Sequence, residues 1–307
     1  MRHLKSEICD LKFARLAREA VDLRPFVAIM HAATPLEATR RFLDSAKMVD
    51  ELAHQRVLNL AADLRKEIIL RLASAKDYEA FRLPHLLGDI NRTMDEWRRQ
   101  YLAESNELFP RYSALGVAQV DGPLTAANIL TPQMPASSIK VFEIAQRFNA
   151  NLVTHVTSDT IAAITREVTL ATTGVQPPFE AMKKIQAQID DPLHFGSLQN
   201  RAEVILRTEG GRVQSLAAQA RLEDAVAVVP GLQKQWLWSG NSRVQHQRIN
   251  GQIKNVGEPF EIPAQGKCPA DKIMFPRDPA GLACQTINCG CQSIPYKAEW
   301  ELDKLAA

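Results

Sequence analysis

The sequence has no long apolar segment, few aromatic residues and almost no net charge. Among its 307 residues there is no run of about 18 apolar residues, so it predicts no membrane-spanning helix. Aromatic residues make up 6% of the chain and glycines number 14, which favours a protein dominated by helices. The formal net charge is +2, so any contact with DNA would need a local basic patch rather than a general electrostatic attraction.

Familiar catalytic motifs are also missing. The sequence lacks the H-x-E and P-C-x-x-C pair of zinc deaminases. It also lacks a G-x-S-x-G elbow, an H-E-x-x-H helix and a P-loop. Only one histidine, His246, lies in the C-terminal part that carries the unusual motifs. We therefore expect no catalytic residues and no enzyme activity.

The composition is that of an ordinary globular protein. Hydrophobic residues make up 46% and charged residues 23%, and the length suits about two domains. Five unevenly spaced cysteines do not resemble a secreted disulfide framework, and the first residues lack the apolar core of a signal peptide. These features predict folding in a reducing cytoplasm.

Helical periodicity dominates the first three quarters of the chain. It predicts helices over residues 10–24, from Pro35 to about Lys76, and over 88–109. Glycines and prolines between residues 110 and 137, among them Gly116 and Pro123, interrupt the pattern. We predict a long-helix N-terminal region at 1–115, a linker or docking loop at 116–136, and a second domain at 137–307.

Several arginines on the helix predicted at 88–109 could suggest a phosphate-binding face. They are Arg92, Arg98 and Arg99. Asp95 and Glu96 interleave with them, which favours an ordinary solvated helix surface.

The second domain begins with further helices, predicted over residues 138–228. Cap signals precede residues 160, 179 and 198, the last of them at Ser197. The last helix contains Arg207-Thr208-Glu209 followed by a glycine pair, which costs about 2 kcal/mol relative to alanine. Such a pair predicts either a kink or the close approach of another backbone.

Residues 229–300 differ from the rest and predict a small α+β module. Trp236 and Trp238 alternate with polar and aliphatic residues, so both rings should share one face of a strand. Asn250-Gly251 is typical of a two-residue turn in a β-hairpin. The predicted fold is therefore mainly α, with long N-terminal helices, a helical region and a small C-terminal α+β module with a short antiparallel sheet.

Four of the five cysteines lie in this module. Cys284, Cys289 and Cys291, with His246 and potentially Cys268, offer sulfur and nitrogen ligands of the kind that zinc prefers. On a strand, Cys289 and Cys291 would point to the same side and reach one ion. Buried free thiols and a disulfide formed after release from the cell are the two other interpretations, and the sequence does not decide among the three.

The order of motifs in this part of the chain resembles a known family. Arg207-Thr208-Glu209, Trp236, Arg243-x-x-His246, Ile249-Asn250-Gly251, Glu258-Pro259-Phe260, Phe275-Pro276-x-Asp278-Pro279 and Asn288-Cys289-x-Cys291 follow one another within residues 157–296. This order is similar to that of the Mu F-like minor head proteins, which act in the head morphogenesis of tailed phages. The chain departs from the family pattern at Asn241, where an acidic residue is usual, and at Gly290, where arginine is usual.

The resemblance implies a structural role. It implies a minor head (capsid) protein that acts in assembly near the portal, with a further role in DNA packaging or ejection. Its expected partners are the portal protein, the major capsid or scaffolding protein, and packaged double-stranded DNA bound non-specifically, with no membrane. It would be found in the virion and, during assembly, in the host cytoplasm. The alternative is a metal-dependent nuclease or toxin-like enzyme domain carried by the phage head.

We expect the motif residues to hold the module together rather than to react. They are Arg207, Glu209, Trp236, Arg243, His246, Asn250, Gly251 and Asn288. With arginine absent at position 290, Arg243 is the expected partner of Glu209.

Overall fold

The structure is a computed structural model, and it describes most of the chain. The described residues are 28–74, 83–129, 138–191, 193, 196–241, 243–300 and 302–305. The helix predicted over residues 10–24 lies outside this part.

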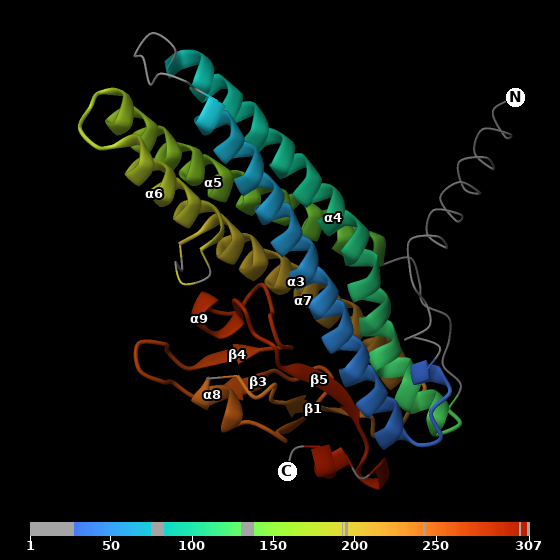
Figure 1. The fold of residues 1–307 in the computed structure, drawn as a ribbon. Helices are drawn as coiled ribbons and strands as arrows, with labels where there is room; N and C mark the ends of the chain where they lie inside the picture. Colours follow the sequence, from blue (N-terminus) through green and yellow to red (C-terminus); the bar gives the residue numbers. More distant parts are fainter. Residues whose placement is uncertain are drawn as a thin grey trace, which may run out of the picture. The chain divides into compact units, whose positions relative to one another are not determined.

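Five long helices and five short strands make up the described part, with short helical turns between them (Figure 1). This confirms the predicted fold of a mainly helical chain with a small antiparallel C-terminal module. The long helices are α3 (Pro35–Ser74), α4 (Leu83–Ala126), α5 (Ser138–Thr172), α6 (Pro178–Asp190) and α7 (Leu198–Val226). None of the helices in the described ranges combines the length and the hydropathy that crossing a bilayer requires.

The helix starts predicted at Pro35 and after Ser197 are confirmed, and a side-chain cap precedes each of them. The Thr34 hydroxyl accepts the backbone N–H of Glu37 at 3.2 Å, and Pro35 occupies the first helical position of α3. The Ser197 hydroxyl accepts the N–H of Asn200 at 3.3 Å at the start of α7. In each case the side chain satisfies a backbone donor that has no partner within the helix.

The linker predicted from residue 116 is wrong as far as Ala126, because α4 continues to that residue. The glycines there mark close packing rather than a break in the helix. A Cβ added at Gly116 would lie 2.2 Å from the carbonyl oxygen of Gln214, and one at Gly122 would lie 2.5 Å from Ile29 Cγ2. A small residue is needed at both positions because another segment lies against the helix.

The cap predicted near residue 158 is also wrong, since α5 runs through it without interruption. The Thr157 hydroxyl donates to the carbonyl of Val153 one turn earlier, at 2.7 Å, so it stays inside the helix. The helical segment ends at Gly174, which has φ at 73°, and the N–H of Val175 donates to the carbonyl of Leu170 at 2.9 Å.

The chain divides into two compact units, each built from separate stretches of sequence. We name residues 49–106 and 142–211 the helical unit, and residues 1–48, 107–141 and 212–307 the mixed unit. The N-terminal helices therefore do not form a unit of their own, unlike the division predicted at residue 115. Helices α3, α4, α5 and α7 each contribute residues to both units.

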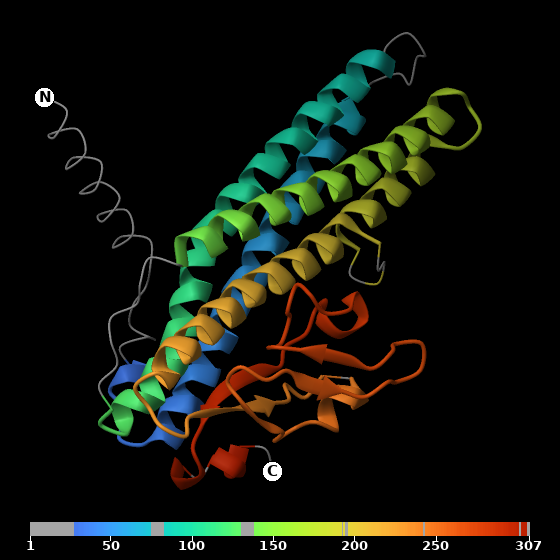
Figure 2. The ribbon, with the colours of Figure 1, turned by 180° about the vertical axis from the view of Figure 1, so that it is seen from behind.

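Aliphatic side chains one turn apart form the interior of the helical unit. In α3 these side chains follow one face of the helix. Figure 2 shows the next two helices of the unit, where α5 leads back into α6. The buried residues of that face are Ala53, Val57, Ala61, Leu64, Ile68 and Leu72. The periodicity of the sequence predicts Val57, Leu60, Leu64, Ile68 and Leu72 on one face. Four of these are buried, whereas Leu60 is only partly buried.

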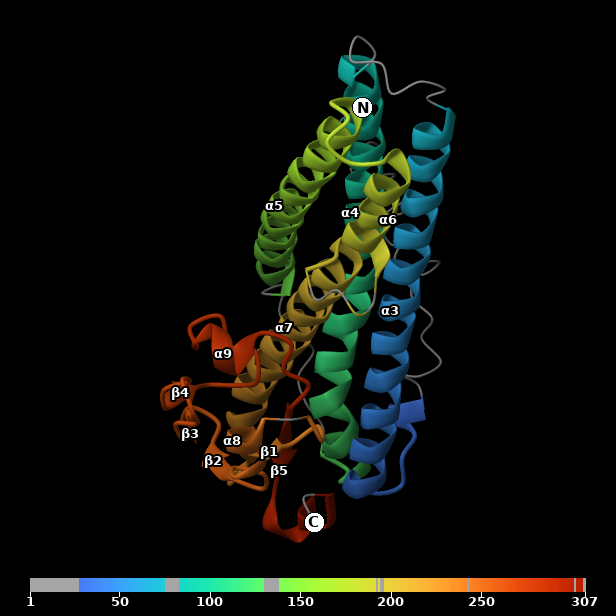
Figure 3. The same cartoon turned by 60° about the vertical axis from the view of Figure 1, so that its left-hand side comes forward.

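The described part of the mixed unit contains two small antiparallel sheets. The first has the strand order β2-β1-β5, with β1 at Gln233–Leu237, β2 at Ile253–Asn255 and β5 at Gln292–Tyr296. The second pairs β3 (Phe260–Ile262) with β4 (Asp271–Ile273). Figures 1 and 2 show the strands beside the last part of α7, and Figure 3 shows β1 and β5 nearer to α4 than β3 and β4 are.

Among the residues that the structure describes, two apolar clusters stabilise the mixed unit. One joins α4 and α7 to the first sheet and contains Val120, Leu222, Val256, Ile294 and Trp300, among others. The other lies between the two sheets and contains Trp236, Ile249, Phe260, Ile262, Ile273, Cys289 and Cys291, with Trp238 partly buried against it. The second cluster contains the sulfur atoms of the candidate site.

The hairpin predicted at Asn250-Gly251 is wrong. Strands β1 and β2 do pair, but the short helix α8 (Val244–Gln247) and further turns separate them. Gly251 has φ at 80°, which favours glycine, and its N–H donates to the carbonyl of Trp236 at 2.8 Å. The Asn-Gly pair thus returns the chain from a helix to the sheet.

Candidate metal centre

The candidate site is a buried group of His246, Cys289 and Cys291. Their ligand atoms all lie within 4.8 Å of one another. The Nδ1 atom of His246 is 3.5 Å from Cys289 Sγ and 3.6 Å from Cys291 Sγ. All three residues are 0% exposed. These are three of the five residues, counting Cys268, that the sequence offered as zinc ligands.

Short turns place the three side chains. His246 lies on α8, whose start is fixed by the N–H of Arg243 donating to Asn241 Oδ1 at 3.0 Å. Cys289 and Cys291 come just before β5 and flank Gly290. A Cβ on Gly290 would lie 2.9 Å from Ser239 Oγ, so this position suits a residue without a side chain.

The imidazole of His246 is held on its other side by Gln285. Its Nε2 atom lies 3.0 Å from Gln285 Oε1. That amide is oriented in turn, because its nitrogen donates to the carbonyl of Pro269 at 3.0 Å and its oxygen accepts from Gln245 at 3.2 Å. The oxygen therefore faces His246, so Nε2 carries a proton, and in the neutral imidazole Nδ1 directs its lone pair at both sulfur atoms.

The two thiols differ in their ease of ionisation. The pKa of Cys289 lies well below its usual range, because Cys291 donates a hydrogen bond to its sulfur and the charge of the Arg277 guanidinium stabilises the thiolate. The same contact raises the pKa of Cys291, and burial raises it further. One proton shared between two sulfur atoms explains the opposite directions. A thiolate beside a neutral imidazole nitrogen is a set of donors suited to a metal ion.

Arg277 fixes the backbone that carries the cysteines. Its guanidinium donates to the carbonyl of Cys289 at 2.7 Å, to Ser215 Oγ at 2.9 Å and to Gln292 Oε1 at 3.4 Å. It is buried, and its backbone adopts the left-handed region at φ 66°. The sequence shows this residue only as part of the Phe-Pro-Arg-Asp-Pro motif, and nothing local indicates that it is buried.

Cys284 is not part of the group, so its assignment as a zinc ligand is wrong. It forms a disulfide with Cys268, and this bond joins α9 (Ala283–Thr286) to the segment before β4. The five-residue spacing from Cys284 to Cys289 suggested a shared ion, but Cys284 lies on α9 and its sulfur is bonded to that of Cys268. The module thus contains one disulfide and two buried free thiols, which are two of the three states considered from sequence.

Other predicted motif residues support the same site. The Trp236 ring meets the edge of the His246 ring, with centroids 5.4 Å apart and planes at 87°. Asn250 Oδ1 accepts the backbone N–H of Trp238 at 2.9 Å. Asn288 adopts φ 53°, a left-handed conformation at the turn before Cys289.

The structure does not bring the whole predicted motif set into one unit. Arg207 and Glu209 belong to the helical unit, whereas Arg243 belongs to the mixed unit. Arg207 pairs with Glu203 at 3.0 Å, and Arg243 donates to the carbonyl of Ile287. Glu209 is buried and raises the pKa of Tyr101, after the larger effect of burial. The proposed pair between Glu209 and Arg243 stays a prediction.

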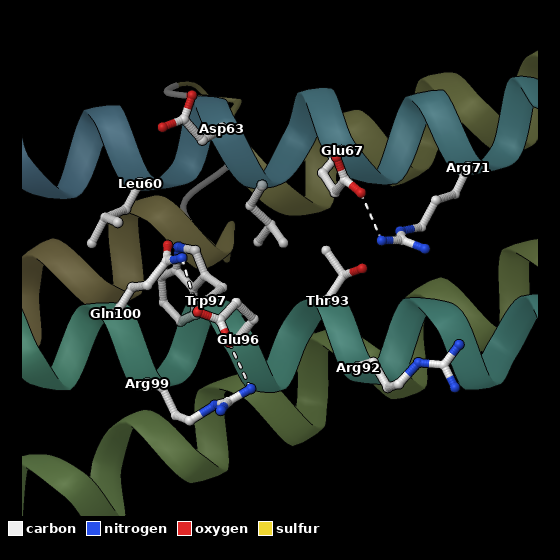
Figure 4. A pocket seen from close by; sticks show the side chains of 11 residues that line it. Leu60, Asp63, Glu67, Arg71, Arg92, Thr93, Glu96, Trp97, Arg99 and Gln100 are labelled. Carbon is white, nitrogen blue, oxygen red and sulfur yellow. Dashed lines mark hydrogen bonds and ion pairs between the residues drawn. The ribbon is translucent and has the colours of Figure 1, made fainter.

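A groove of about 420 Å³ between α3 and α4 is a weaker candidate (Figure 4). Its charged side chains satisfy one another, as in the pairs Glu67–Arg71 and Glu96–Arg99, both at 2.6 Å. The predicted arginine face behaves in the same way, since Arg92 pairs with Asp89 and Arg98 with Asp95. This pattern favours a solvated helix surface over a phosphate-binding face.

Comparisons with known proteins give one partial likeness. No protein-family model and no solved structure matches the chain. A stretch of 92 residues is 34% identical to part of the NAD(+)--arginine ADP-ribosyltransferase EFV of Enterococcus faecalis. That stretch is 29% of this chain, and the match spans 18% of the length of the enzyme.

Proposed function

We propose that this chain is a structural minor head protein of a tailed phage, and that it acts in head assembly near the portal. Support comes from the ordered motifs shared with Mu F-like proteins. Of these motif residues, Trp236, Ile249, Phe260, Cys289 and Cys291 share one apolar cluster of the mixed unit. The resemblance supplies the biological setting, and the contacts of these residues supply a physical reason why they occur together.

The observation that carries the proposal is the burial of the reactive side chains. His246, Cys289 and Cys291 are 0% exposed, and each nitrogen of the imidazole already faces a protein group. A general base or nucleophile must reach its substrate directly or through a water molecule. These residues are suited to holding α8 against the start of β5, which is a structural role.

Partner contacts are proposed for the long helices. Helices α3, α4 and α5 have 40, 44 and 35 residues, and they offer far more length than the strands do. We propose the portal protein as the main partner, with the major capsid or scaffolding protein as further ones. Packaged DNA would be bound only weakly, because the arginines of α4 pair with acids on the same helix. The protein would reside in the virion, and in the host cytoplasm during assembly.

The test is mass spectrometry of purified procapsids and mature particles, combined with chemical cross-linking. We expect this chain in procapsids, with lysines of the helical unit, such as Lys183 and Lys184 on α6, cross-linked to the portal protein. Particles prepared from a deletion strain provide the background. Absence of the chain from both kinds of particle would overturn the proposal.

An enzymatic role is the second candidate, since the partial relative is named an ADP-ribosyltransferase. The match covers less than a fifth of that enzyme, so the activity in its name does not have to reside in the matched part. We expect the purified chain to show neither NAD⁺ consumption with an arginine substrate nor metal-dependent cleavage of DNA. Cleavage that is present in the wild type and lost in His246→Ala would favour the enzyme.

A further inference from the structure

We propose that His246, Cys289 and Cys291 bind one zinc ion, which acts as a structural link in the mixed unit. The proposal is independent of the role in phage heads and adds a ligand to the chain. The three residues come from two segments that lie 43 and 45 positions apart in sequence. An ion bound by them would tie α8 to the start of β5.

The distances suit tetrahedral zinc. Zinc bonds of about 2.3 Å to sulfur and about 2.0–2.1 Å to nitrogen, at a tetrahedral angle, place the two atoms about 3.5–3.6 Å apart. The observed separations of His246 Nδ1 from the two sulfur atoms are 3.5 and 3.6 Å. A single ion could therefore bond to all three atoms with little movement of the backbone.

The orientation of the imidazole supplies a second, independent observation. Gln285 accepts the proton of Nε2 and leaves the Nδ1 lone pair directed at the sulfur atoms. Histidine ligands of metals commonly donate their second ring nitrogen to an oxygen in this way, which fixes the tautomer. The Gln285 amide is itself anchored at Pro269, so the ring is held before any ion arrives.

The chemistry of the donors selects the ion. Two thiolates and an imidazole favour zinc over calcium and magnesium, which take oxygen ligands. Ser239 Oγ and Asn241 Nδ2 each lie 3.9 Å from Cys291 Sγ, so polar groups adjoin the sulfur on one side. Binding would displace the remaining thiol protons to solvent. The three side chains would supply three of the four bonds that zinc takes.

The first experiment measures metal directly on the full-length chain. We would purify it without chelators under argon, determine its metals by elemental analysis, and then replace zinc by cobalt. We expect one zinc per chain, and a cobalt form with the absorption bands of a tetrahedral site and with sulfur-to-cobalt charge transfer. Folded wild-type protein that takes up neither ion would overturn the proposal, as would stoichiometric copper in place of zinc.

Variants then assign the ligands. His246→Ala should lower the affinity for zinc at least tenfold. His246→Cys should keep one bound ion, and its third thiolate should strengthen the charge-transfer band of the cobalt form. The double variant Cys268→Ser/Cys284→Ser should keep one zinc, because the disulfide lies outside the ligand set. Circular dichroism shows which variants fold, and only those are compared. Retention of zinc by folded His246→Ala would overturn the assignment.

The role of Gln285 gives a sharper test, because this residue does not touch the ion. Gln285→Leu removes the acceptor of the Nε2 proton and should weaken zinc binding by about 10–100-fold. Gln285→Glu keeps an acceptor oxygen at the same place and should bind zinc like the wild type. Equal zinc affinity in folded Gln285→Leu would show that the ring is not oriented by this contact and would overturn the argument.

Discussion

The two units bury different kinds of side chain. The interior of the helical unit is built from aliphatic residues one turn apart, such as Val57, Leu64 and Ile68. Among the described residues, the helical unit also buries two carboxylates, Glu167 and Glu209, whereas the mixed unit buries three cations, Arg221, Lys234 and Arg277. An aliphatic interior tolerates any neighbour of suitable size, whereas a buried charge needs particular partners in particular directions. The comparison predicts that substitutions at buried aliphatic positions of the helical unit cost less free energy of unfolding than substitutions of the buried cations of the mixed unit.

Buried glutamine side chains link the helices of the mixed unit to its sheet by hydrogen bonds. Gln214 on α7 donates from one amide to Gln119 on α4 at 3.2 Å and to Gln292 on β5 at 2.9 Å. Gln119 in turn donates to the carbonyl of Ser293 at 2.6 Å. Neutral amides thus connect two helices to the sheet, and each bond depends on a residue far away in sequence.

The largest effect is expected at Arg277. Arg277→Ala removes the buried guanidinium together with its three hydrogen bonds. This change should lower the free energy of unfolding of the mixed unit by about 4 kcal/mol. Arg277→Lys keeps the charge but loses the planar fork, and should cost about 2–3 kcal/mol. Both variants keep a side chain at the same left-handed φ, so backbone strain cancels between them.

The helical unit provides the reference for this measurement. Ile164→Val, a change at a fully buried position, should cost about 0.5–1.5 kcal/mol. Hydrogen exchange followed by mass spectrometry reports the two units separately. A larger cost for Ile164→Val than for Arg277→Lys would break the comparison between the units.

The disulfide should have the next largest effect. It closes a sequence separation of 16 residues, and a loop of that length corresponds to about 3 kcal/mol. We expect Cys268→Ala/Cys284→Ala to lower the hydrogen-exchange protection of β3 and β4 and to leave that of α5 unchanged. Mild reduction of the wild type should reproduce the effect. Equal loss of protection in α5 would mean that the two units open together.

Lys234 should make the free energy of unfolding of the mixed unit depend on pH. Burial lowers the pKa of this amine from 10.5 to about 8, while Glu223, Asp278 and Glu258 act in the opposite direction. The folded state therefore releases its proton at a lower pH than the unfolded state does. The free energy of unfolding should rise between pH 8 and 10.5, by up to about 3 kcal/mol.

Lys234→Met provides the control for this prediction. Methionine keeps most of the packing against Phe260 and cannot titrate, so the rise with pH should disappear. Urea unfolding of the two proteins at matched pH values removes the contribution of tyrosines and surface groups. A rise of the same size in both proteins would show that another group is responsible.

Much of the helical architecture could be predicted from sequence, because its signals are local. Thr34-Pro35 and Ser197 are typical of helix starts, and the spacing of apolar residues predicts the buried face of each helix. The same reasoning found His246, Cys289 and Cys291, since their residue types are unusual together. It could not separate them from Cys284, because a pairing with Cys268 depends on the path of the chain and not on spacing.

Gln285 and Arg277 could not be predicted, since no local pattern distinguishes a buried amide or guanidinium from an exposed one. Their partners, Pro269 for the amide and Ser215 for the guanidinium, lie 16 and 62 residues away in sequence. The linker predicted around Gly116 and Gly122 of α4 is wrong for a related reason. Glycine is equally suited to a chain break and to close contact between helices, and only the neighbouring segment tells the two apart.

The smallest expected effect tests that last distinction, on two glycines of the same helix. Gly116→Ala places a Cβ 2.2 Å from the Gln214 carbonyl and 2.9 Å from the Ala217 side chain. The α4 and α7 segments of the mixed unit would have to separate, at a cost of about 1–3 kcal/mol. Gly88→Ala meets nothing within 4 Å and should stabilise α4 by up to about 1 kcal/mol, because alanine is the better helix former. Thermal unfolding of the two variants should therefore shift in opposite directions. If both were stabilised, residues 116–126 would not be packed as a helix against α7, and the linker expected from sequence would be restored.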